Sequence, residues 1–347
     1  MPLNEPNWWY RDRLSWQAAA LAPLSWAYGQ AAALRFRLST PYRTRLPVIC
    51  IGNFTAGGTG KTPLSLAIAG LVRDLGREPV FLSRGYGGDL KGPVFVDPTR
   101  HTARDVGDEP LLLARMAPAV IARRRAQGAR FIEASSNVRT VIIMDDGLQN
   151  PSIFKNLAIA VIDGKRGLGN GWTMPSGPLR APLAFQSGLA GAVVLNGGTG
   201  PVPEIAGLRR LLTRYSGPLF HGHAEPKDET SHLEGAKLIA YAGIANPERF
   251  FAALEQLGAN LQARVPFPDH HAFTAENAER LLAMVAATGG QLITTEKDLV
   301  RLEGTGDEAL TRLGKASWTL PIRLTFDNDG AAELLRLIGR AIQRRPA

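Results

Sequence analysis

A glycine loop between a buried strand and a helix constrains this chain more than any other feature. Residues 48–51 form an apolar, mostly β-branched run, which predicts a buried strand. The chain then breaks at Gly57-Gly58-Thr59-Gly60-Lys61-Thr62 and resumes, up to Leu75, as a mostly apolar helical pattern. A strand, a glycine loop, a Lys-Thr pair and a helix, in this order, predict a phosphate-binding loop.

The chemistry of such a loop follows from its backbone. Glycines let successive backbone N–H groups converge on phosphate oxygens, and the helix N-terminus adds a partial positive charge. Lys61 reaches the β- and γ-phosphates, and the Thr62 hydroxyl suits Mg²⁺. The expected nucleotide-binding residues are Thr55, Ala56, Gly57, Gly58, Thr59, Gly60, Lys61 and Thr62. Thr55 replaces the first glycine of the general pattern, and a turn that binds nothing is the alternative interpretation.

Composition limits the partners of the chain. Its 347 residues favour two lobes rather than one core, and its net charge of +9 suits an anionic partner. No basic run interleaved with stacking aromatic residues occurs, so we expect no nucleic acid partner. The single cysteine, Cys50, cannot form an internal disulfide, in keeping with a reducing compartment.

Residues 8–38 suggest contact with a membrane. They begin with three aromatic residues and two arginines, continue as an uncharged run over 14–34, and end with two more arginines. The run is long enough to span a bilayer, but its Gln, Pro, Gly and Ala residues leave it only weakly apolar. The clustered aromatic residues Trp8, Trp9 and Tyr10, with arginines at both ends of the uncharged run, predict a segment lying in the membrane interface. A helix pair packed on the protein is the alternative.

Two adjacent aspartates follow another apolar strand. Residues 140–144 predict a buried strand, and Asp145 and Asp146 come directly after it. Parallel sheets bind ligands at the carboxyl ends of their strands, and acidic residues there are placed to hold Mg²⁺ opposite Thr62. One aspartate alone would be explained as a turn cap. We therefore expect a metal site made of Thr62, Asp145 and Asp146.

The first half of the chain otherwise alternates strands, helices and glycine-rich loops. Further buried strands are predicted at residues 79–83, 119–122, 157–163 and 192–196, the last of them closing the first lobe. Arg84-Gly85-Tyr86-Gly87-Gly88 follows one strand, so the backbone there bends or approaches a ligand. Asp108 precedes a helical run, and a helix N-cap is the alternative to a functional role. The long loop 164–182 carries Arg166 and Arg180, which can bind phosphate.

Strand–helix units return after a Gly- and Pro-rich stretch and a charged segment at residues 197–236. Strands are predicted at 237–242, 261–266 and 291–295, helices at 247–257 and 274–287, and a terminal helix at 331–343. This pattern predicts a smaller parallel α/β lobe. His270 and His271 lack the spacing of zinc ligands on a helix face, so a zinc site is not expected.

The sequence as a whole predicts an α/β protein of three parts. A P-loop NTPase-like lobe with a parallel sheet occupies residues 46–222, and a second, smaller α/β lobe occupies residues 223–347. Residues 1–45 form an N-terminal helical membrane-interface segment. The C-terminal helix is free to pack back on the first lobe.

Three classes of P-loop protein compete for this architecture. A GTPase needs Asn/Thr-Lys-x-Asp for guanine, and the closest string, Thr295-Glu296-Lys297-Asp298, has the wrong spacing. A membrane-recruited switching ATPase of the partition type is closer, but Ala56 stands at the signature lysine of that class. The third class is a kinase that phosphorylates a membrane-bound acceptor.

The ordered set of motifs resembles the tetraacyldisaccharide 4'-kinases, the lipid A 4'-kinases of the Gram-negative inner membrane. The matching strings are GNFTAGGTGKTP (52–63), SRGYG (83–87), VGDEP (106–110), DDGLQ (145–149), GNG (169–171), GPLR (177–180), DHH (269–271) and TEKD (295–298). Each string is weak alone, but the ordered set is highly specific and the resemblance spans residues 8–298. The chain departs from the family at Asn150, Leu168 and Ala181, where His, Phe and Glu are common.

The resemblance implies transfer of the γ-phosphate of ATP, with Mg²⁺, to the 4'-hydroxyl of a tetraacylated glucosamine disaccharide 1-phosphate. The family's catalytic acidic residue maps onto Asp108, paired with His270, and Lys61 is the third expected catalytic residue. The expected acceptor contacts are Arg84, Tyr86, Asn170 and Arg180. Because Asp108 and His270 belong to different predicted lobes, closure of the lobes would assemble the pair.

The same resemblance implies a location and partners. We expect a monomer on the cytoplasmic face of the inner membrane, bound peripherally or monotopically. Its expected partners are the acylated disaccharide 1-phosphate lipid and an anionic membrane surface.

Overall fold

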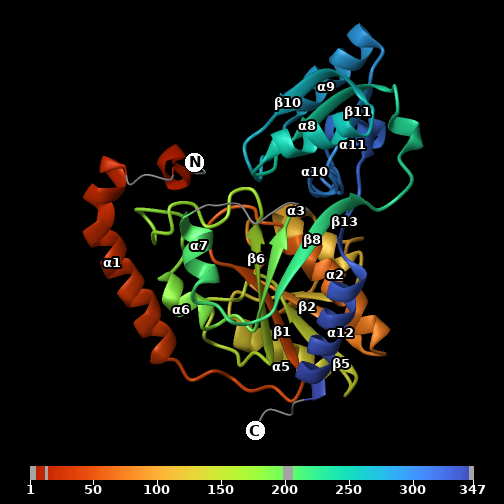
Figure 1. Cartoon of the computed structure of the whole chain (residues 1–347). Coiled ribbons are helices and arrows are strands. Elements are labelled where there is room, and N and C mark those ends of the chain that lie inside the picture. Colours follow the sequence, from red (N-terminus) through yellow and green to blue (C-terminus); the bar gives the residue numbers. More distant parts are fainter. Residues whose placement is uncertain (1–4, 12–14, 198–205, 344–347) are drawn as a thin grey trace.

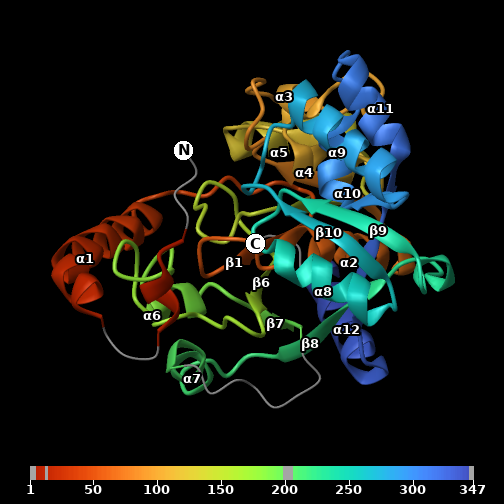
Figure 2. The same cartoon turned by 90° about the horizontal axis from the view of Figure 1, so that it is seen from above.

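Two parallel sheets of different size organise the molecule (Figure 1). The structure, a computed structural model, describes residues 5–11, 15–197 and 206–343. Within these ranges a nine-stranded sheet runs in the order β13-β8-β7-β6-β1-β5-β2-β4-β3, and a four-stranded sheet in the order β10-β9-β11-β12. Seen from above, α1 lies on one side of the molecule and the helices of the smaller sheet on the other (Figure 2).

The large sheet is parallel except at its edges. Its strands are β1 (Val48–Asn53), β2 (Glu78–Ser83), β3 (Val94–Phe95), β4 (Ala119–Ile121), β5 (Thr140–Met144), β6 (Leu157–Asp163), β7 (Ala192–Asn196), β8 (Leu219–Pro226) and β13 (Ile322–Phe326). β3 pairs with β4, and β13 with β8, in antiparallel fashion. The central strands are buried along their whole length, as expected for parallel strands covered on both faces.

Helices cover both faces of the large sheet, and alternate strand residues face opposite cores. Ile49 and Ile51 of β1 pack with the apolar side of α2, whereas Val48 and Cys50 pack with Ile132 of α5. The helices are α2 (Lys61–Asp74), α3 (Ala103–Val106), α4 (Asp108–Ala114), α5 (Arg125–Ser135), α6 (Leu183–Ser187), α7 (Ala206–Leu212) and α12 (Asn328–Gln343).

The small sheet is parallel throughout and forms the core of the second lobe. Its strands are β9 (Lys237–Ala242), β10 (Asn260–Pro266), β11 (Gln291–Thr294) and β12 (Ser317–Thr319). Its helices are η2 (Ser231–Leu233), α8 (Pro247–Gln256), α9 (Ala275–Thr288), α10 (Glu296–Leu302) and α11 (Glu308–Ala316). The strand–helix order predicted for residues 237–295 is therefore confirmed.

The large sheet does not end where the sequence indicates. Residues 192–196 were expected as the last strand of the first lobe, but β8 and β13 continue the same sheet beyond β7. The expected boundary at residue 222 falls inside β8. The pattern of β8, LFHGHAEP, is too polar to indicate a buried strand, and its partner β13 lies about a hundred residues later in the sequence. The chain thus leaves the large lobe, builds the small one and returns.

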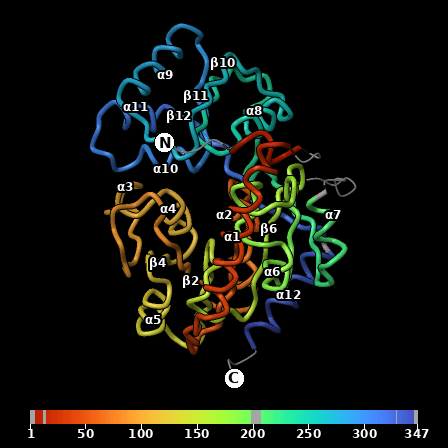
Figure 3. The backbone as a smooth tube through the Cα atoms, turned by 90° about the vertical axis from the view of Figure 1, so that its left-hand side faces the viewer, coloured from red at the N-terminus to blue at the C-terminus, as the bar shows by residue number. Residues whose placement is uncertain are grey.

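An N-terminal helix lies along the large lobe (Figure 3). A short 3₁₀ helix, η1 (Asn7–Tyr10), precedes α1 (Trp16–Arg37), whose first turn is capped by the Ser15 hydroxyl. The buried face of α1 consists of small residues, namely Ala18, Ser25, Gly29 and Ala33. A Cβ at Gly29 would lie 2.9 Å from Cγ of Pro182, so glycine permits this close approach.

The outward face of α1 and the residue after it are apolar, with large exposed side chains at Trp16, Leu24, Trp26, Leu34 and Leu38. Trp9, which the sequence assigns to the membrane interface, is instead buried and donates from Nε1 to the Pro175 carbonyl at 3.0 Å. Among the described residues, no helix combines the length and apolarity needed to cross a membrane.

The return of the chain makes α12 part of the large lobe, and this can be tested. Ile338 is fully buried in the same core as Ile68 of α2. Ile338→Ala should lower the free energy of unfolding by about 2–5 kcal/mol, because it removes buried methyl groups and leaves a cavity. Arg336→Ala, on the exposed side of the same helix, should change it by less than about 0.5 kcal/mol. Equal urea denaturation curves for wild type and Ile338→Ala would contradict the assignment.

Candidate active site

The predicted phosphate loop connects β1 to α2 with the required backbone. Gly57 and Gly60 have positive φ values of 90° and 91°. A Cβ at Gly60 would lie 2.0 Å from Nδ2 of Asn196, so no larger residue fits there. Asn196 Nδ2 donates to the Thr59 carbonyl at 3.0 Å, and Asn53 Nδ2 donates to the Gly57 carbonyl at 3.3 Å. Strands β1 and β7 therefore hold the loop from both sides.

Several polar atoms around this loop have no partner within the described chain. They are Asn53 Oδ1, Thr59 Oγ1 and Asn196 Oδ1, all buried. Buried polar groups normally find a hydrogen-bond partner, so unpaired atoms here indicate room for a polar ligand. Together with the open N-terminus of α2 and Lys61, they fit the phosphates of a nucleotide.

The two aspartates lie at the carboxyl end of β5, as predicted. Ser65 of α2 donates its hydroxyl proton to Asp145 Oδ1 at 2.9 Å, and Arg180 Nη1 donates to Asp146 Oδ1 at 2.6 Å. Burial, followed by the charges of Glu109 and Asp146, raises the pKa of Asp145. Burial acts on Asp146 in the same direction, but Lys61 and Arg180 outweigh it and lower the pKa of that residue.

This edge fits a metal ion that arrives with a nucleotide. No group of three or more His, Cys, Asp or Glu residues within the described ranges is arranged to hold a metal. Mg²⁺ commonly keeps one or two protein carboxylates and takes its remaining ligands from phosphates and water. A carboxylate pair beside Lys61 and the phosphate loop meets that requirement.

Asp108 and His270 meet although 162 residues separate them. Asp108 Oδ2 lies 3.0 Å from His270 Nδ1. Asp108 is the first residue of α4, whose N-cap is Gly107, and Asp108 Oδ1 accepts the adjacent Glu109 N–H. The alternative role of Asp108 as the helix N-cap is therefore not what the structure shows. His270 stands in the loop after β10 with a φ of 56°. The neighbouring His271 instead bonds Asn277 Oδ1 at 2.8 Å.

The small lobe adds charged residues that sequence reasoning did not assign. Lys297 and Arg301 of α10 reach across to Glu109 and Asp108, respectively. Burial would raise the pKa of Asp108, but its hydrogen bond to His270 and the charges of Lys297 and Arg301 hold it well below the usual range. The only sequence signal for these residues is the TEKD string, which contains Lys297 but not Arg301.

Two of the predicted acceptor residues, Arg84 and Tyr86, are exposed, whereas Arg180 and Asn170 are hydrogen-bonded within the large lobe. Tyr86 is 68% exposed, and its ring meets that of His270 edge-on at 5.7 Å between centroids, while Arg84 is exposed in the same turn. Arg180 donates from Nε to the Thr55 carbonyl as well as to Asp146. Asn170 uses its side chain within its own loop, accepting from Trp172 N–H and donating to the Ser176 carbonyl.

The other loop arginine and the family departures have structural partners. Arg166, a candidate phosphate ligand, donates to Glu5 Oε2 at 3.0 Å. Leu168 and Ala181 are both buried, so these two departures change internal packing. Asn150 accepts from the backbone N–H of Ser152 and caps a turn.

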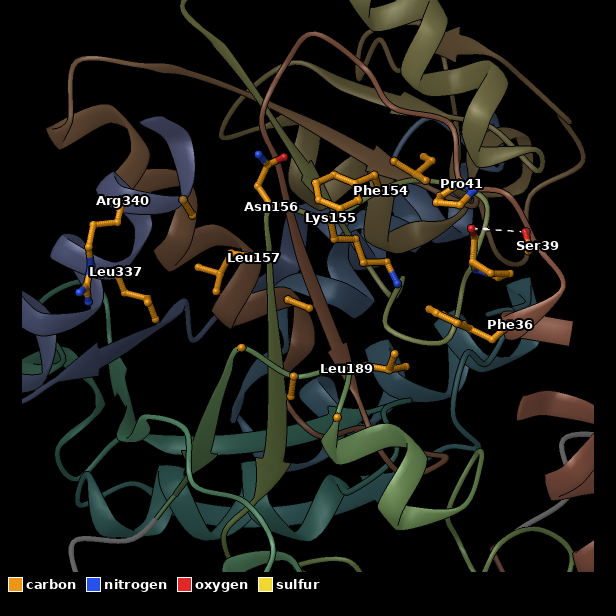
Figure 4. Close-up of a pocket in the computed structure, with 17 residues that line it drawn as sticks. Phe36, Ser39, Pro41, Phe154, Lys155, Asn156, Leu157, Leu189, Leu337 and Arg340 are labelled. Carbon is orange, nitrogen blue, oxygen red and sulfur yellow. Dashed lines mark hydrogen bonds between the residues drawn. The ribbon is translucent and has the colours of Figure 1, made fainter. Parts of the chain in front are cut away.

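A cavity of about 570 Å³ lies at the opposite end of the large sheet (Figure 4). Its walls include Phe36 in the last turn of α1, Lys155 before β6, and Leu337 and Arg340 of α12. These elements lie at the amino ends of the strands, whereas the phosphate loop and Asp145 follow the carboxyl ends. The cavity is therefore separate from the candidate active site.

Comparisons with known proteins agree along nearly the whole chain. The model of the family described as tetraacyldisaccharide-1-P 4'-kinase, LpxK, matches residues 17–339. The tetraacyldisaccharide 4'-kinase of Bradyrhizobium sp. strain BTAi1 is 44% identical over 347 residues, covering 99% of this chain and 98% of that protein. Its counterpart in Methylorubrum extorquens strain PA1 is 47% identical over 301 residues, covering 86% and 90% of the two chains.

The fold comparison gives the same result. A crystal structure described as an "apo" form of LpxK from Aquifex aeolicus in complex with ATP matches with a TM-score of 0.73 and 25% identity. The match covers 94% of this chain and 99% of that chain. These findings confirm the resemblance drawn from the motifs and give no support to the partition-type ATPase. This chain belongs to the tetraacyldisaccharide-1-phosphate 4'-kinase family.

Proposed function

We propose that this chain phosphorylates its acceptor with a base assembled from both lobes. As a member of its family it is an ATP-dependent tetraacyldisaccharide 4'-kinase of lipid A biosynthesis. The observation that carries the proposed mechanism is the 3.0 Å contact between Asp108 Oδ2 and His270 Nδ1. It lies at the edge where Ala245 of the small lobe approaches the phosphate-loop Gly58.

The pair is suited to remove the proton of a sugar hydroxyl. The ionised Asp108 only accepts hydrogen bonds, so His270 carries its proton on Nδ1 and leaves Nε2 as the base. The 4'-hydroxyl proton passes to Nε2 while the hydroxyl oxygen forms a bond to the γ-phosphorus of ATP. The bond between that phosphorus and the β–γ bridging oxygen breaks, and ADP leaves.

The phosphate loop supplies the second part of the proposed mechanism. Residues 55–62 would hold the phosphates, with Lys61 neutralising the charge that develops during transfer. Thr62, Asp145 and Asp146 are the proposed Mg²⁺ ligands, and bound Mg²⁺ supplies further neutralisation of the phosphate oxygens. Arg180 is placed to keep Asp146 ionised and oriented.

The acceptor is proposed to enter beside Tyr86. This exposed ring lies against His270, and Arg84 in the same turn offers a positive charge. Arg180 bridges Thr55 and Asp146 and so faces the place where phosphate would be transferred. We assign Asn170 an indirect role, because both ends of its amide hold the loop that carries Arg180.

Helix α1 is proposed to bring the enzyme to the surface that holds its lipid acceptor. Its exposed apolar side chains are unusual for a free surface, and contiguous apolar patches mark membrane or protein contacts. Arg35 and Arg37 in the last turn add positive charge next to that face. Apolar burial combined with attraction to anionic lipid is the pattern of an interfacial helix. The cytoplasmic face of the inner membrane, where ATP and this acceptor meet, is the proposed location.

Replacing the loop lysine should stop the reaction. Lys61→Ala should reduce kcat by about 10²-fold or more, because it removes a positive charge that stabilises the transition state. The assay is transfer of phosphate from ATP to the acylated disaccharide 1-phosphate. Lys237→Ala, an exposed lysine in the small lobe, serves as the control and should leave kcat unchanged. A wild-type rate for Lys61→Ala would reject the assigned loop.

Asp108 and His270 should behave as one unit in a double-mutant cycle. Asp108→Ala and His270→Ala should each lower kcat by roughly 10²–10⁴-fold, the usual contribution of a general base. The double variant should be little worse than the poorer single variant, since groups that act together are non-additive. His232→Ala, an exposed histidine, is the control. Losses that multiply would show that the two residues act independently.

The membrane proposal depends on the outward face of α1. Trp16→Ser combined with Trp26→Ser should weaken binding to anionic liposomes by at least roughly tenfold, because both exposed rings lose their apolar contact. Co-sedimentation with liposomes measures the effect. Trp318→Ser, which removes a half-exposed ring from the small lobe, is the matched control. Equal sedimentation of all three proteins would remove α1 as the binding element.

A further inference from the structure

A buried arginine from the small lobe holds the catalytic carboxylate of the large lobe. Arg301 donates from Nε to Asp108 Oδ2 at 2.7 Å, and its Nη2 donates to the same oxygen. The side chains of Arg301 and Asp108 are only 6% and 5% exposed, respectively. This forked contact holds Oδ2 of Asp108, and the Glu109 N–H holds Oδ1 at 2.8 Å, so together they fix the position and the orientation of the carboxylate.

The arginine itself is oriented by a second buried carboxylate. Nη1 of Arg301 donates to Asp298 Oδ1 at 2.6 Å and to the Gly243 carbonyl at 2.7 Å. Asp298 is fully buried, and it also accepts from the Gly243 N–H and from the Thr295 hydroxyl. The backbone N–H of His270 donates to the same Gly243 carbonyl. Arg301 and His270 are thus anchored at one point, the carboxyl end of β9.

We propose that Arg301, oriented by Asp298, is a positioning residue that keeps Asp108 ionised and aimed at His270, so that the histidine presents its unprotonated Nε2 to the acceptor. This inference rests on the proposed function, in which Asp108 and His270 act on the hydroxyl. It gives the segment that begins with the TEKD string, residues 295–301, a role in positioning the proposed catalytic pair.

The position of the proton on His270 depends on the charge of Asp108. A charged Asp108 can only accept, so Nδ1 must be the protonated nitrogen. A neutral Asp108 would carry a proton of its own and could donate it to Nδ1, which would leave the ring proton on Nε2. A histidine with that tautomer cannot take the hydroxyl proton. The permanent positive charge of Arg301 beside the Asp108 carboxylate therefore keeps that carboxylate ionised and protects the catalytic tautomer of His270.

Lys297 favours the same tautomer from the other side of the ring. Its ammonium group lies 3.3 Å from His270 Nε2 and is held by Glu109 Oε1 at 3.1 Å. An ammonium group has no lone pair, so Nε2 must be the accepting nitrogen in this contact. The two groups within hydrogen-bond distance of the ring nitrogens, Asp108 and Lys297, therefore agree on the proton position, while the Asp269 carboxylate lies farther from Nε2, at 3.9 Å.

The main test is removal of the forked contact. Arg301→Met should lower kcat by on the order of 10²-fold, a typical loss when a catalytic group is misplaced by about 1 Å. The KM for ATP should stay within about threefold, because Arg301 acts through Asp108 and not on the phosphate loop. Arg301→Lys should restore part of the loss, since it returns the charge without the fork. Arg312→Met, which breaks an exposed ion pair with Glu279 in the same lobe, should leave kcat unchanged.

A double variant separates positioning from stability. In Asp108→Asn with Arg301→Met, kcat should be no lower than in Asp108→Asn alone, and the melting temperature should exceed that of Arg301→Met. In the double variant only the buried carboxylate of Asp298 loses its arginine partner, whereas Arg301→Met alone leaves both Asp298 and Asp108 without it. Losses in kcat that multiply, or a wild-type kcat in Arg301→Met, would overturn the proposal. A wild-type kcat in Asp108→Asn would instead overturn the proposed function of the pair.

A milder change covers the case in which Arg301→Met does not fold. Asp298→Asn keeps the shape of the side chain but weakens its hold on Arg301, so it should lower kcat by roughly tenfold with an unchanged KM for ATP. A lower melting temperature with wild-type kcat in Asp298→Asn would assign these residues to structure alone and reject the positioning role.

Discussion

A carboxylate that is removed from water stays ionised only when it has charged or hydrogen-bonding partners, and Asp108 finds them in the other lobe. This dependence ties the two sheets together at the place where chemistry is proposed. Arg301 provides a permanent positive charge that keeps Asp108 ionised, and His270 is the proposed base that the ionised Asp108 orients. The large lobe alone would leave Asp108 without either. The proposed Asp108–His270 pair therefore forms only when both lobes are folded and in contact.

The contact between the two lobes is possible because the central strands of both sheets are parallel. Parallel strands bring their carboxyl ends, and the loops that follow them, to one edge. In the large lobe this edge carries the phosphate loop and the aspartates after β5. In the small lobe it carries Gly243, His270 and the start of α10. Contacts such as Arg249 with Asp163, at 3.6 Å, join the two edges directly.

Local patterns in the sequence were sufficient to predict much of the fold and part of the candidate site. The apolar strands, the glycine loop and the Asp145–Asp146 pair are encoded over short windows, and the structure places them as predicted. The contact between Asp108 and His270 followed from family resemblance and not from spacing. Arg301 could not be found in either way, because its role depends on a neighbour 193 residues away. For the same reason β8 and β13 were missed, since each is defined by pairing with a distant strand.

Both lobes are proposed to act together on the 4'-hydroxyl of a lipid-linked sugar. The most direct test is to incubate the purified full-length chain with ATP, Mg²⁺ and the tetraacylated disaccharide 1-phosphate, and to locate the new phosphate by NMR. We expect a phosphomonoester at the 4' position, formed in equal amount with ADP. Hydrolysis of ATP without a phosphorylated disaccharide, or a phosphate at another hydroxyl, would contradict it.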